Sequence, residues 1–423
     1  MNRRLEKILA AGGRKIKTAS TRPRRGAFLP RELHLELTYR CNQECVMCDI
    51  WPRSRGEGGL PAELSQGEIE KAVENSRILD DLEMILLTGG EPFLRSDLVD
   101  LAVFFLRRYP RARLMILSNF FATGLIEKKI RAILDAAPAA RLSLGTSLDG
   151  LDETHDRVRA VDGAFAALIK TVRMVKTNFP AIPVESNFTL TPANHAQLLP
   201  AYRFARQMGM GFTAQFPISW PGTPSFKWRG KDLDKVEDAV SLILEDIYRR
   251  SPRPGGIVTP DLLSRLYYWK GLVEYQRQPR RVFASCPASH RYVMLSPAGD
   301  LYFCPKLKNM VVGNILQTPL DDLWRGEKSE KIRRMIDSGG CHCWLNCTTY
   351  FALSETFSRA GISSRLLRTG FYRGGTIARE GRRRAAALAS AAVQTAVYSL
   401  TFPYLFLRVL AALFRRRLHR SGF

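Results

Sequence analysis

The sequence predicts an α/β fold built on a parallel sheet, because apolar strand-like runs alternate along the chain with segments of helical periodicity. The predicted strands are residues 33–38, 83–88, 112–118, 141–147, 182–190 and 211–217. The segments of helical spacing between them include residues 66–79, 96–108, 163–176 and 194–208. Reactive residue types follow the first four strands, and a parallel barrel gathers its functional side chains at those strand ends. The 423 residues, 45% of them apolar, can bury a barrel core and one small added domain.

Three cysteines within eight residues, Cys41, Cys45 and Cys48, follow the first predicted strand. Thiolates are soft ligands that suit iron–sulfur clusters or zinc, and a 4Fe–4S cluster normally takes four of them. A structural site closes its coordination shell, whereas a reactive site keeps one position open. The loop therefore predicts a reactive cluster with one open position. A zinc site that borrows a distant ligand, or a chance group of buried thiols, is the alternative.

A second motif, Gly89-Gly90-Glu91-Pro92, follows the second predicted strand. Two glycines let a backbone approach a ligand closely. Alone, the segment would be a turn with a solvated carboxylate. Together with the spacing Cys-x3-Cys-x2-Cys, it resembles the radical S-adenosylmethionine (SAM) superfamily, although an aromatic residue is frequent there at the position of Met47.

The resemblance implies a partial (β/α)6 TIM-type barrel in which the three cysteines hold a catalytic 4Fe–4S cluster. SAM chelates the fourth iron through its amino and carboxylate groups. A one-electron donor such as flavodoxin or ferredoxin reduces the cluster, and the resulting 5′-deoxyadenosyl radical abstracts hydrogen from a substrate. The residues that the resemblance assigns to SAM at these two motifs are Met47, near the adenine, and Gly89, Gly90 and Glu91, at the amino group.

Further candidates for SAM binding follow the later strands. Ser147-Leu148-Asp149-Gly150 resembles a segment of the subgroup that carries an extra C-terminal cluster domain, where the serine lies near the ribose of SAM. That subgroup often has an arginine soon afterwards. An Asp-Gly turn followed by charges on a helix surface is the alternative for this segment. The candidates are Ser118 and Asn119 after the third strand, Ser147, Asp149 and Arg159 after the fourth, and Asn187 in the fifth.

Five more cysteines lie beyond the barrel: Cys286, Cys304, Cys341, Cys343 and Cys347. A hairpin turn is expected at residues 296–300, and the segment resembles the SPASM and twitch auxiliary-cluster domains of the same superfamily. The cysteines are too few for two auxiliary clusters, so we expect one auxiliary 4Fe–4S cluster held by Cys286, Cys304 and two of the last three. Cys343 and Cys347 are the preferred pair, with Cys341 spare. A structural zinc site, or disulfides, which a reducing compartment disfavours, are the alternatives.

The net charge of +24 at pH 7 is concentrated at the two ends of the chain. Residues 1–31 hold ten Lys or Arg and one acidic residue, and residues 351–423 hold thirteen basic and two acidic residues. The long middle of the chain is therefore nearly neutral. This distribution argues against nucleic acid as the main partner, because a nucleic-acid-binding domain would carry the charge itself.

An apolar run at residues 385–414 is flanked by arginine triplets at 382–384 and 415–417. Residues 385–407 are uncharged and long enough to span a bilayer. However, Pro403 interrupts the run, and arginines on both sides favour neither orientation. We therefore expect an interfacial helix or a shallow re-entrant hairpin at a membrane surface, with the arginines at anionic headgroups. A soluble helix packed on the barrel is the alternative.

The predicted organisation has four parts. Residues 1–31 form a basic extension, 32–250 the barrel, 251–350 the auxiliary-cluster domain and 351–423 a basic, apolar helical tail. Residues 1–27 lack the apolar stretch of a secretory leader, so we expect a cytoplasmic protein associated peripherally with the cytoplasmic face of the membrane.

The predicted function is that of a membrane-associated radical SAM enzyme, an oxidoreductase or transferase, that acts on a peptide, protein or lipid-type substrate. The alternative is a non-catalytic iron–sulfur redox or assembly protein whose tails bind membrane or nucleic acid. The Gly-Gly-Glu segment and the barrel pattern favour the enzyme.

Overall fold

The computed structural model describes residues 29–53, 62–138, 141–218, 226–252, 258–280 and 286–359, and the isolated Glu6. The tail beyond residue 359 and nearly all of the basic N-terminal extension lie outside these ranges. The strands of the described chain are β1 Glu32–Thr38, β2 Met84–Gly89, β3 Arg113–Leu117, β4 Leu142–Ser147, β5 Val184–Thr189, β6 Gly211–Gln215, β7 Tyr292–Leu295, β8 Asp300–Tyr302 and β9 Gly313–Asn314.

Helices follow most of the strands. The α-helices are α2 Ile50–Arg53, α3 Gln66–Glu74, α4 Leu98–Arg108, α5 Thr123–Ala136, α6 Asp152–Arg159, α7 Ala164–Asn178, α8 Leu198–Gln207, α9 Gly230–Arg250, α10 Pro260–Arg277, α11 Ala288–Arg291, α12 Leu320–Arg325, α13 Glu327–Asp337 and α14 Asn346–Arg359. Three 3-10 turns are η1 Pro92–Leu94, η2 His195–Gln197 and η4 Pro305–Leu307. None of the helices in the described ranges combines the length and the apolar character that crossing a bilayer requires.

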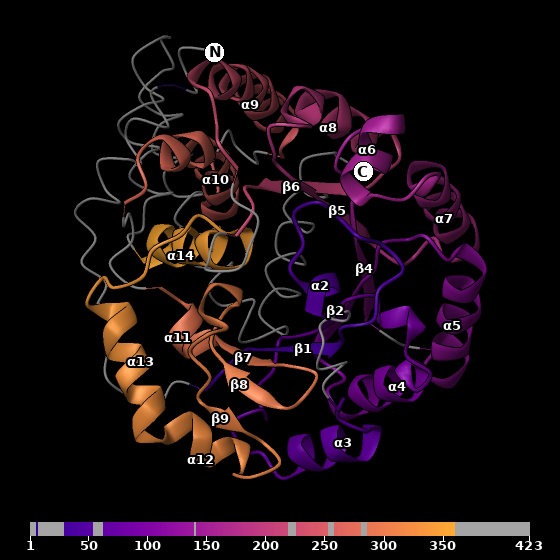
Figure 1. The fold of residues 1–423 in the computed structure, drawn as a ribbon, viewed down its shortest axis with the longest axis vertical. Helices are drawn as coiled ribbons and strands as arrows, with labels where there is room; N and C mark the ends of the chain where they lie inside the picture. Colours follow the sequence, from indigo (N-terminus) through magenta and orange to yellow (C-terminus); the bar gives the residue numbers. More distant parts are fainter. Residues whose placement is uncertain are drawn as a thin grey trace, which may run out of the picture.

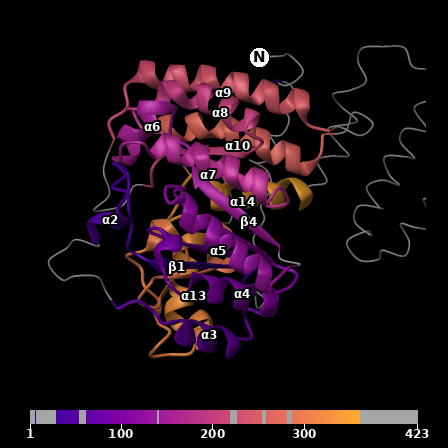
Figure 2. The ribbon, with the colours of Figure 1, turned by 90° about the vertical axis from the view of Figure 1, so that its right-hand side faces the viewer.

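The described strands form one sheet in the order β6-β5-β4-β3-β2-β1-β7-β8-β9. Strands β1 to β6 run parallel, β7 lies parallel to β1 on its other edge, and β8 and β9 continue antiparallel. The strands surround the middle of the molecule, and α3 to α9 form an arc outside them (Figure 1). Figure 2 shows this arc from its outer side, with α3 at one end and α9 at the other. The predicted α/β fold with a partial parallel barrel is confirmed.

The six predicted barrel strands agree with β1 to β6 to within two residues at each end. The helix predicted over 66–79, in contrast, ends at Glu74. Asp321 of α12 accepts hydrogen bonds from Ser76 Oγ (2.5 Å) and from the backbone N–H of Arg77 (3.2 Å), which hold the chain away from a helical path. Because Asp321 is distant in the sequence, the local periodicity of residues 66–79 carries no sign of it.

Strand β1 lies inside the sheet, between β2 and β7, and is buried on both faces. Its three leucines, which are at most 2% exposed, face the apolar core as the pattern of alternation predicts. The opposite face carries charged groups. Glu32 accepts hydrogen bonds from His34 Nε2 (3.0 Å) and Arg291 Nε (2.8 Å), and Glu36 pairs with Lys308 Nζ (2.5 Å). Both cations come from the auxiliary region, so these buried ion pairs join that region to β1.

The antiparallel pair β7–β8 is the hairpin expected at residues 296–300, with Gly299 in a left-handed conformation at its turn (φ 90°). Helix α9 packs against α10, and α10 packs against α14. Elements that precede residue 250 therefore pack against elements that follow it, both in the sheet and among these helices. The division of the chain at that residue stays a prediction.

Trp344 connects the cysteine-rich segment to α10. Its indole Nε1 donates to the backbone carbonyl of Tyr268 (2.9 Å), and its ring stacks on Tyr268 and Tyr275 at centroid distances of 6.4 and 6.1 Å. Gly271 makes room for this ring, because a Cβ there would lie 1.9 Å from the indole. The position of Trp344 next to Cys343 makes this packing part of the support for the auxiliary cysteines.

We expect Gly271→Ala to destabilise the protein by about 1–3 kcal/mol, since overpacking a buried contact costs about that much. Displacement of Trp344 should also lower the iron content of the auxiliary site. Urea unfolding and iron analysis measure both effects. Gly124→Ala is the matched control, because a Cβ at that helical position meets nothing within 4 Å. Equal stability of the two variants would show that the contact with Trp344 is unimportant.

Candidate active site

The loop after β1 is held by hydrogen bonds from several directions. The Cys45 carbonyl accepts from the Cys48 N–H (3.0 Å) and from the Trp51 indole (3.1 Å). The N–H of Val46 donates to the carbonyl of Val158 in α6 (3.0 Å). The loop is thus fixed to itself and to the helix that follows β4.

Each of the three thiols of this loop has a hydrogen-bond donor at its sulfur. Arg159 Nη1 lies 3.4 Å from Cys45 Sγ, the Ile50 N–H lies 3.4 Å from Cys48 Sγ, and Asn119 Nδ2 lies 3.9 Å from Cys41 Sγ. Burial raises the pKa of Cys41 to about 11 and also raises the pKa of Cys48. The thiolate is the form that binds a metal, and the donors at these sulfurs are in place to stabilise it.

Gln43 provides a test of whether this loop fits a cluster. Its side chain is 1% exposed, its Oε1 accepts from the Cys45 thiol (3.8 Å), and its Nε2 has no partner among the residues that the structure describes. A thiolate bound to iron cannot donate, but the opposite orientation of the amide would turn the unpaired Nε2–H toward the sulfur. The amide of Gln43 can therefore accommodate a ligated Cys45.

The three thiols do not converge as ligands of one metal ion do. Within the described ranges, no three His, Cys, Asp or Glu side chains lie close enough to hold a single ion. A 4Fe–4S cluster instead offers a separate iron to each cysteine.

The two glycines of the second motif lie against the start of the cysteine loop. The Gly90 N–H donates to the Thr38 carbonyl (2.7 Å), and the Glu91 N–H donates to the Arg40 carbonyl (2.8 Å). A Cβ on Gly89, whose φ is 128°, would lie 2.3 Å from the Thr38 oxygen, and one on Gly90 would lie 2.2 Å from the Arg40 oxygen. Close packing of two backbones thus explains both glycines, independently of their expected contact with SAM.

Glu91 is almost completely buried, with 1% of its surface exposed. Its carboxylate accepts hydrogen bonds from the N–H groups of Phe93 (3.0 Å) and Asn119 (2.8 Å) and from Ser118 Oγ (3.1 Å). Burial raises the pKa of this carboxyl to about 7, although the three hydrogen bonds oppose the shift. In this structure Glu91 holds the ends of β2 and β3 together. Its contact with the SAM amino group stays a prediction.

Asp149 and Arg159 form a buried ion pair beside the cysteine loop. Arg159 Nη2 donates to Asp149 Oδ2, and the second carboxylate oxygen accepts from the Thr189 N–H (2.6 Å). The backbone N–H of Asp149 donates to His155 Nδ1 (3.1 Å). Burial lowers the pKa of His155 to about 3, so this ring stays neutral. These residues are not the surface charges of the alternative interpretation, since Asp149 is 0% and Arg159 8% exposed.

The remaining SAM candidates occupy different positions. Ser147 and Met47 are half-buried at the end of β4 and in the cysteine loop. Asn187 pairs with Ser147 across the β4–β5 register, and its Oδ1 accepts from Thr213 Oγ1 (3.1 Å) and from Asn346 Nδ2 (3.1 Å). The SAM contacts of Ser147, Met47 and Asn187, like those of Asp149 and Arg159, stay predictions.

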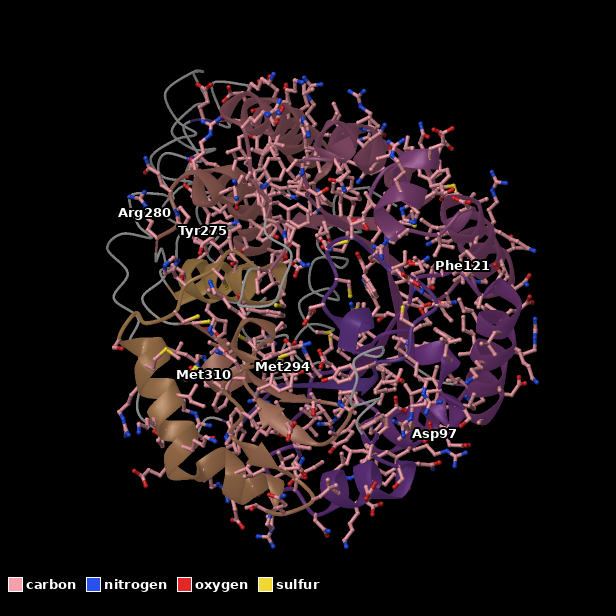
Figure 3. All side chains as sticks on the ribbon, viewed as in Figure 1. Asp97, Phe121, Tyr275, Arg280, Met294 and Met310 are labelled. Atoms are coloured by element: carbon pink, nitrogen blue, oxygen red, sulfur yellow. The ribbon has the colours of Figure 1, made fainter. Side chains whose placement is uncertain are left out.

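The five auxiliary cysteines gather around Cys304, in a region where Tyr275, labelled in Figure 3, hydrogen-bonds His342 Nδ1 (2.8 Å). Burial raises the pKa of Cys304 well above its usual range, and the other four thiols raise it further. All eight cysteines are free thiols. One four-iron cluster needs four ligands, so this group fits an auxiliary cluster with one cysteine to spare. Which of the last three ligates stays a prediction.

Three polar residues were missed in the sequence. Asn194 Nδ2 donates to the carbonyls of Asp149 (3.0 Å) and Thr189 (2.9 Å). Asn346 Oδ1 accepts from the N–H of Cys347 (2.7 Å), and Asn346 Nδ2 donates to Asn187. Gln43, the third, lies between Cys41 and Cys45, two of the predicted ligands. Proximity to cysteines was the only signal for Gln43 and Asn346, and Asn194 had none.

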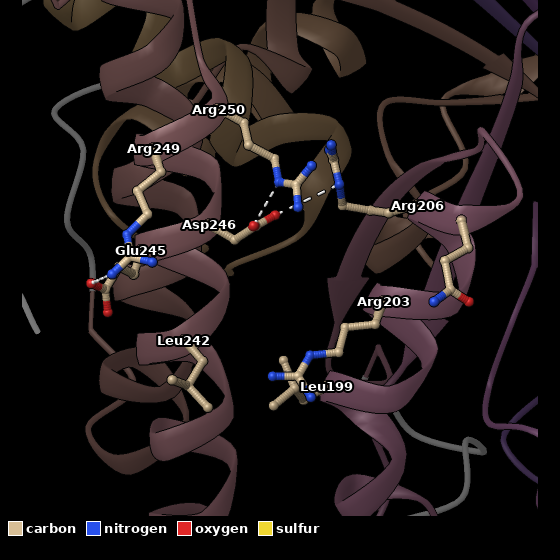
Figure 4. A pocket seen from close by; sticks show the side chains of 9 residues that line it. Leu199, Arg203, Arg206, Leu242, Glu245, Asp246, Arg249 and Arg250 are labelled. Carbon is tan, nitrogen blue, oxygen red and sulfur yellow. Dashed lines mark hydrogen bonds and ion pairs between the residues drawn. The ribbon is translucent and has the colours of Figure 1, made fainter.

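A groove of about 500 Å³ lies between α8 and α9, on the outer arc of helices (Figure 4). It is lined by Leu199 and Leu242 and by polar residues that include Arg203, Arg249 and Glu245. None of the cysteines lines it. The chemistry assigned to the strand ends therefore does not depend on this groove.

Two protein-family models match the chain. The radical SAM superfamily model matches residues 35–205, and a SPASM iron–sulfur cluster-binding domain matches residues 286–348. The chain is 26% identical to the pre-heme d1 synthase of Dinoroseobacter shibae, over 72% of this chain and 76% of that protein. It is 23% identical to the PqqA peptide cyclase of Granulibacter bethesdensis, over 74% and 83%. SuiB of Streptococcus suis, solved with bound SAM, has a similar fold, with a TM-score of 0.51 at 15% identity over 73% of this chain and 68% of SuiB.

The chain belongs to the radical SAM superfamily. It is an enzyme that binds SAM at a 4Fe–4S cluster and carries an auxiliary cluster in a SPASM domain. The matched ranges contain the cysteine loop, the Gly-Gly-Glu segment and the five later cysteines. The similar proteins are named as synthases and cyclases, which supports the predicted enzyme over the non-catalytic alternative.

We expect Gly90→Ala to displace Arg40 and the adjacent Cys41, because the new Cβ would lie 2.2 Å from the Arg40 oxygen. The reconstituted variant should then lack the SAM-binding cluster and hold about four irons instead of about eight. Iron analysis and electron paramagnetic resonance (EPR) measure this loss. Gly67→Ala, where a Cβ meets nothing within 4 Å, is the control and should load fully. Full loading of both variants would refute the tight packing of the two motifs.

Proposed function

We propose that this radical SAM enzyme abstracts hydrogen from a C–H bond of a peptide or protein substrate. One observation supports the SAM-dependent half of the proposal. The three-thiol loop and the Gly-Gly-Glu segment follow the neighbouring parallel strands β1 and β2, and buried Arg159 of α6 contacts the loop there. This is the edge at which parallel barrels place their reactive groups.

When bound, the cluster supplies the electron that splits SAM into methionine and a 5′-deoxyadenosyl radical. The protein binds SAM and orients it. We assign the SAM amino group to the segment Gly89–Glu91 and the ribose to Ser147. Arg159 Nε, which has no partner within the described ranges, remains available as a further donor to SAM. A soluble one-electron donor such as flavodoxin or ferredoxin would deliver the electron.

A peptide-type substrate is favoured by two of the similarities. The chain resembles proteins named PqqA peptide cyclase, and SuiB was solved with its precursor peptide SuiA. Other similar proteins are named as haem synthases and GTP cyclases, so the family alone does not select the substrate. The SPASM domain of this chain is the part that we assign to the peptide.

A lipid-type substrate is the second candidate, and the apolar run at residues 385–414 favours it. To separate the two candidates, the protein can be produced together with short peptides encoded beside its gene. We expect one peptide to lose hydrogen, as measured by mass spectrometry, only when Cys41, Cys45 and Cys48 are intact. An altered polar lipid with unaltered peptides would favour the lipid instead.

Replacement of Cys41, Cys45 and Cys48 together by Ala should abolish the SAM-binding cluster. We expect the anaerobically reconstituted variant to keep the auxiliary cluster's roughly four irons. It should form no 5′-deoxyadenosine from SAM under a strong reductant, as measured by chromatography.

The matched control replaces Cys286 and Cys304 by Ala. This variant should lose the auxiliary iron and retain the cleavage of SAM without substrate, because none of its altered residues belongs to the first loop. Stoichiometric zinc in place of iron in the wild-type protein, or SAM cleavage by the triple variant, would refute the proposed function.

We also propose peripheral association with the cytoplasmic face of the membrane through the basic, apolar tail, whose residues beyond 359 lie outside the described ranges. The expectation rests on the arginine triplets that flank an uncharged run. Attraction to anionic headgroups contributes about 1 kcal/mol for each basic residue near the surface.

Truncation after about residue 380 should move the enzyme from the membrane fraction to the soluble fraction. Both clusters and the cleavage of SAM should persist, because no proposed ligand lies beyond Cys347. High salt should release part of the full-length protein, since ions screen headgroup attraction. Release by detergent alone would indicate a spanning tail, and full solubility of the intact protein would refute the membrane assignment.

A further inference from the structure

Arg159 differs from the other donors at the three thiols. Cys41 faces a neutral amide, and Cys48 faces a backbone N–H. Arg159 brings the only full positive charge that hydrogen-bonds one of these thiols in the described part of the chain, with Nη1 3.4 Å from Cys45 Sγ. A guanidinium keeps its charge at every accessible pH, so this donor is always cationic.

Burial makes the contact electrostatically strong. Cys45 is 6% exposed and Arg159 is 8% exposed, so little water screens the pair. Asp149 balances the charge, but it binds the other terminal nitrogen, Nη2, whereas Nη1 meets the sulfur. The guanidinium therefore turns one N–H edge to the sulfur and another to its counter-ion, so a cationic donor faces Cys45.

The guanidinium is held in this orientation by its surroundings. Asp149 is itself fixed by Thr189 and His155, and the carbonyl of Val158, the residue before Arg159, accepts from the loop residue Val46. Helix α6 and the cysteine loop are thus tied at two adjacent residues.

We infer that Arg159 raises the reduction potential of the SAM-binding cluster through its hydrogen bond to the ligand sulfur of Cys45, with Asp149 as the residue that positions it. Hydrogen bonds to the sulfurs are one of the protein's means of setting cluster potentials. Reduction by an external one-electron donor adds negative charge to the cluster and its sulfurs. A cationic N–H then binds more strongly, which favours the reduced state. The inference rests on the proposed SAM-binding cluster.

The test is a redox titration of the full-length, reconstituted protein without SAM, followed by EPR. The signal that changes on addition of SAM identifies the SAM-binding cluster, and the auxiliary cluster serves as an internal reference. We expect Arg159→Gln to lower the ratio of reduced to oxidised SAM-binding cluster about tenfold at a fixed ambient potential. This corresponds to a midpoint about 59 mV more negative for a one-electron couple. The auxiliary midpoint should not move.

Two further variants sharpen the test. Arg159→Lys keeps the charge but loses the fork that serves Cys45 and Asp149 together, so we expect a smaller shift in the same direction. Arg157 lies on the same helix, and its side chain is 68% exposed. Arg157→Gln should therefore leave both midpoints unchanged. If Arg159→Gln fails to load iron, the midpoint of the SAM-binding cluster in Arg159→Lys tests the inference instead.

An unchanged midpoint in every iron-loaded Arg159 variant would overturn the inference. A loss of SAM affinity without a shift in the SAM-free titration would do the same, because it would confine Arg159 to SAM binding. An equal shift of both clusters would indicate a general structural change and would also count against it. Failure of the proposed function is distinguishable, since the wild-type protein would then lack a SAM-responsive cluster signal.

Discussion

The burial of β1 is the constraint on which the rest of the structure depends. The strand has a parallel neighbour on each edge, β2 and β7, and all of its residues are buried, so both of its faces are covered as well. A strand in this position would ordinarily be apolar throughout, but one face of β1 carries Glu32, His34 and Glu36. Buried carboxylates need partners, because an unpaired buried charge is strongly destabilising. Arg291 and Lys308 supply them from the SPASM region, and this requirement joins the second half of the chain to the first.

The ion pairs explain why the SAM-binding and auxiliary regions share one sheet. The segment that carries Arg291 leads directly into β7, and β7 extends the barrel sheet beyond β1. On the far side of the barrel, Asn346 hydrogen-bonds Asn187 of β5 and lies next to Cys347. The auxiliary cysteines are therefore tied to the barrel on both sides, which gives the two cluster sites a defined relation to each other.

Around the first site, buried polar groups take the place of apolar packing. Glu91 joins β2 to β3, and Asp149 joins β4, β5 and α6. Each of these carboxylates accepts hydrogen bonds from backbone N–H groups that strand ends and turns leave unpaired, and leaving such groups unsatisfied in the interior would be costly. Glu91 and Asp149 thus stabilise the strand ends, in addition to the contacts with SAM that are predicted for them. Arg159 connects this framework to Cys45, a predicted ligand of the cluster.

The sequence by itself determined the strand and helix order, the two groups of cysteines and the glycines of the second motif. Periodicity and the short spacing of the ligands are local properties, so they can be seen without a structure. The end of α3, the partners of Glu32 and Glu36, and the contact of Arg159 with Cys45 were decided only in three dimensions. Arg159 and Cys45 are 114 residues apart, and Asn346 and Asn187 are 159 apart. No local pattern links such residues. Their meeting depends on the parallel sheet, which brings successive strand ends to one edge, and on the burial that obliges each polar group there to find a partner.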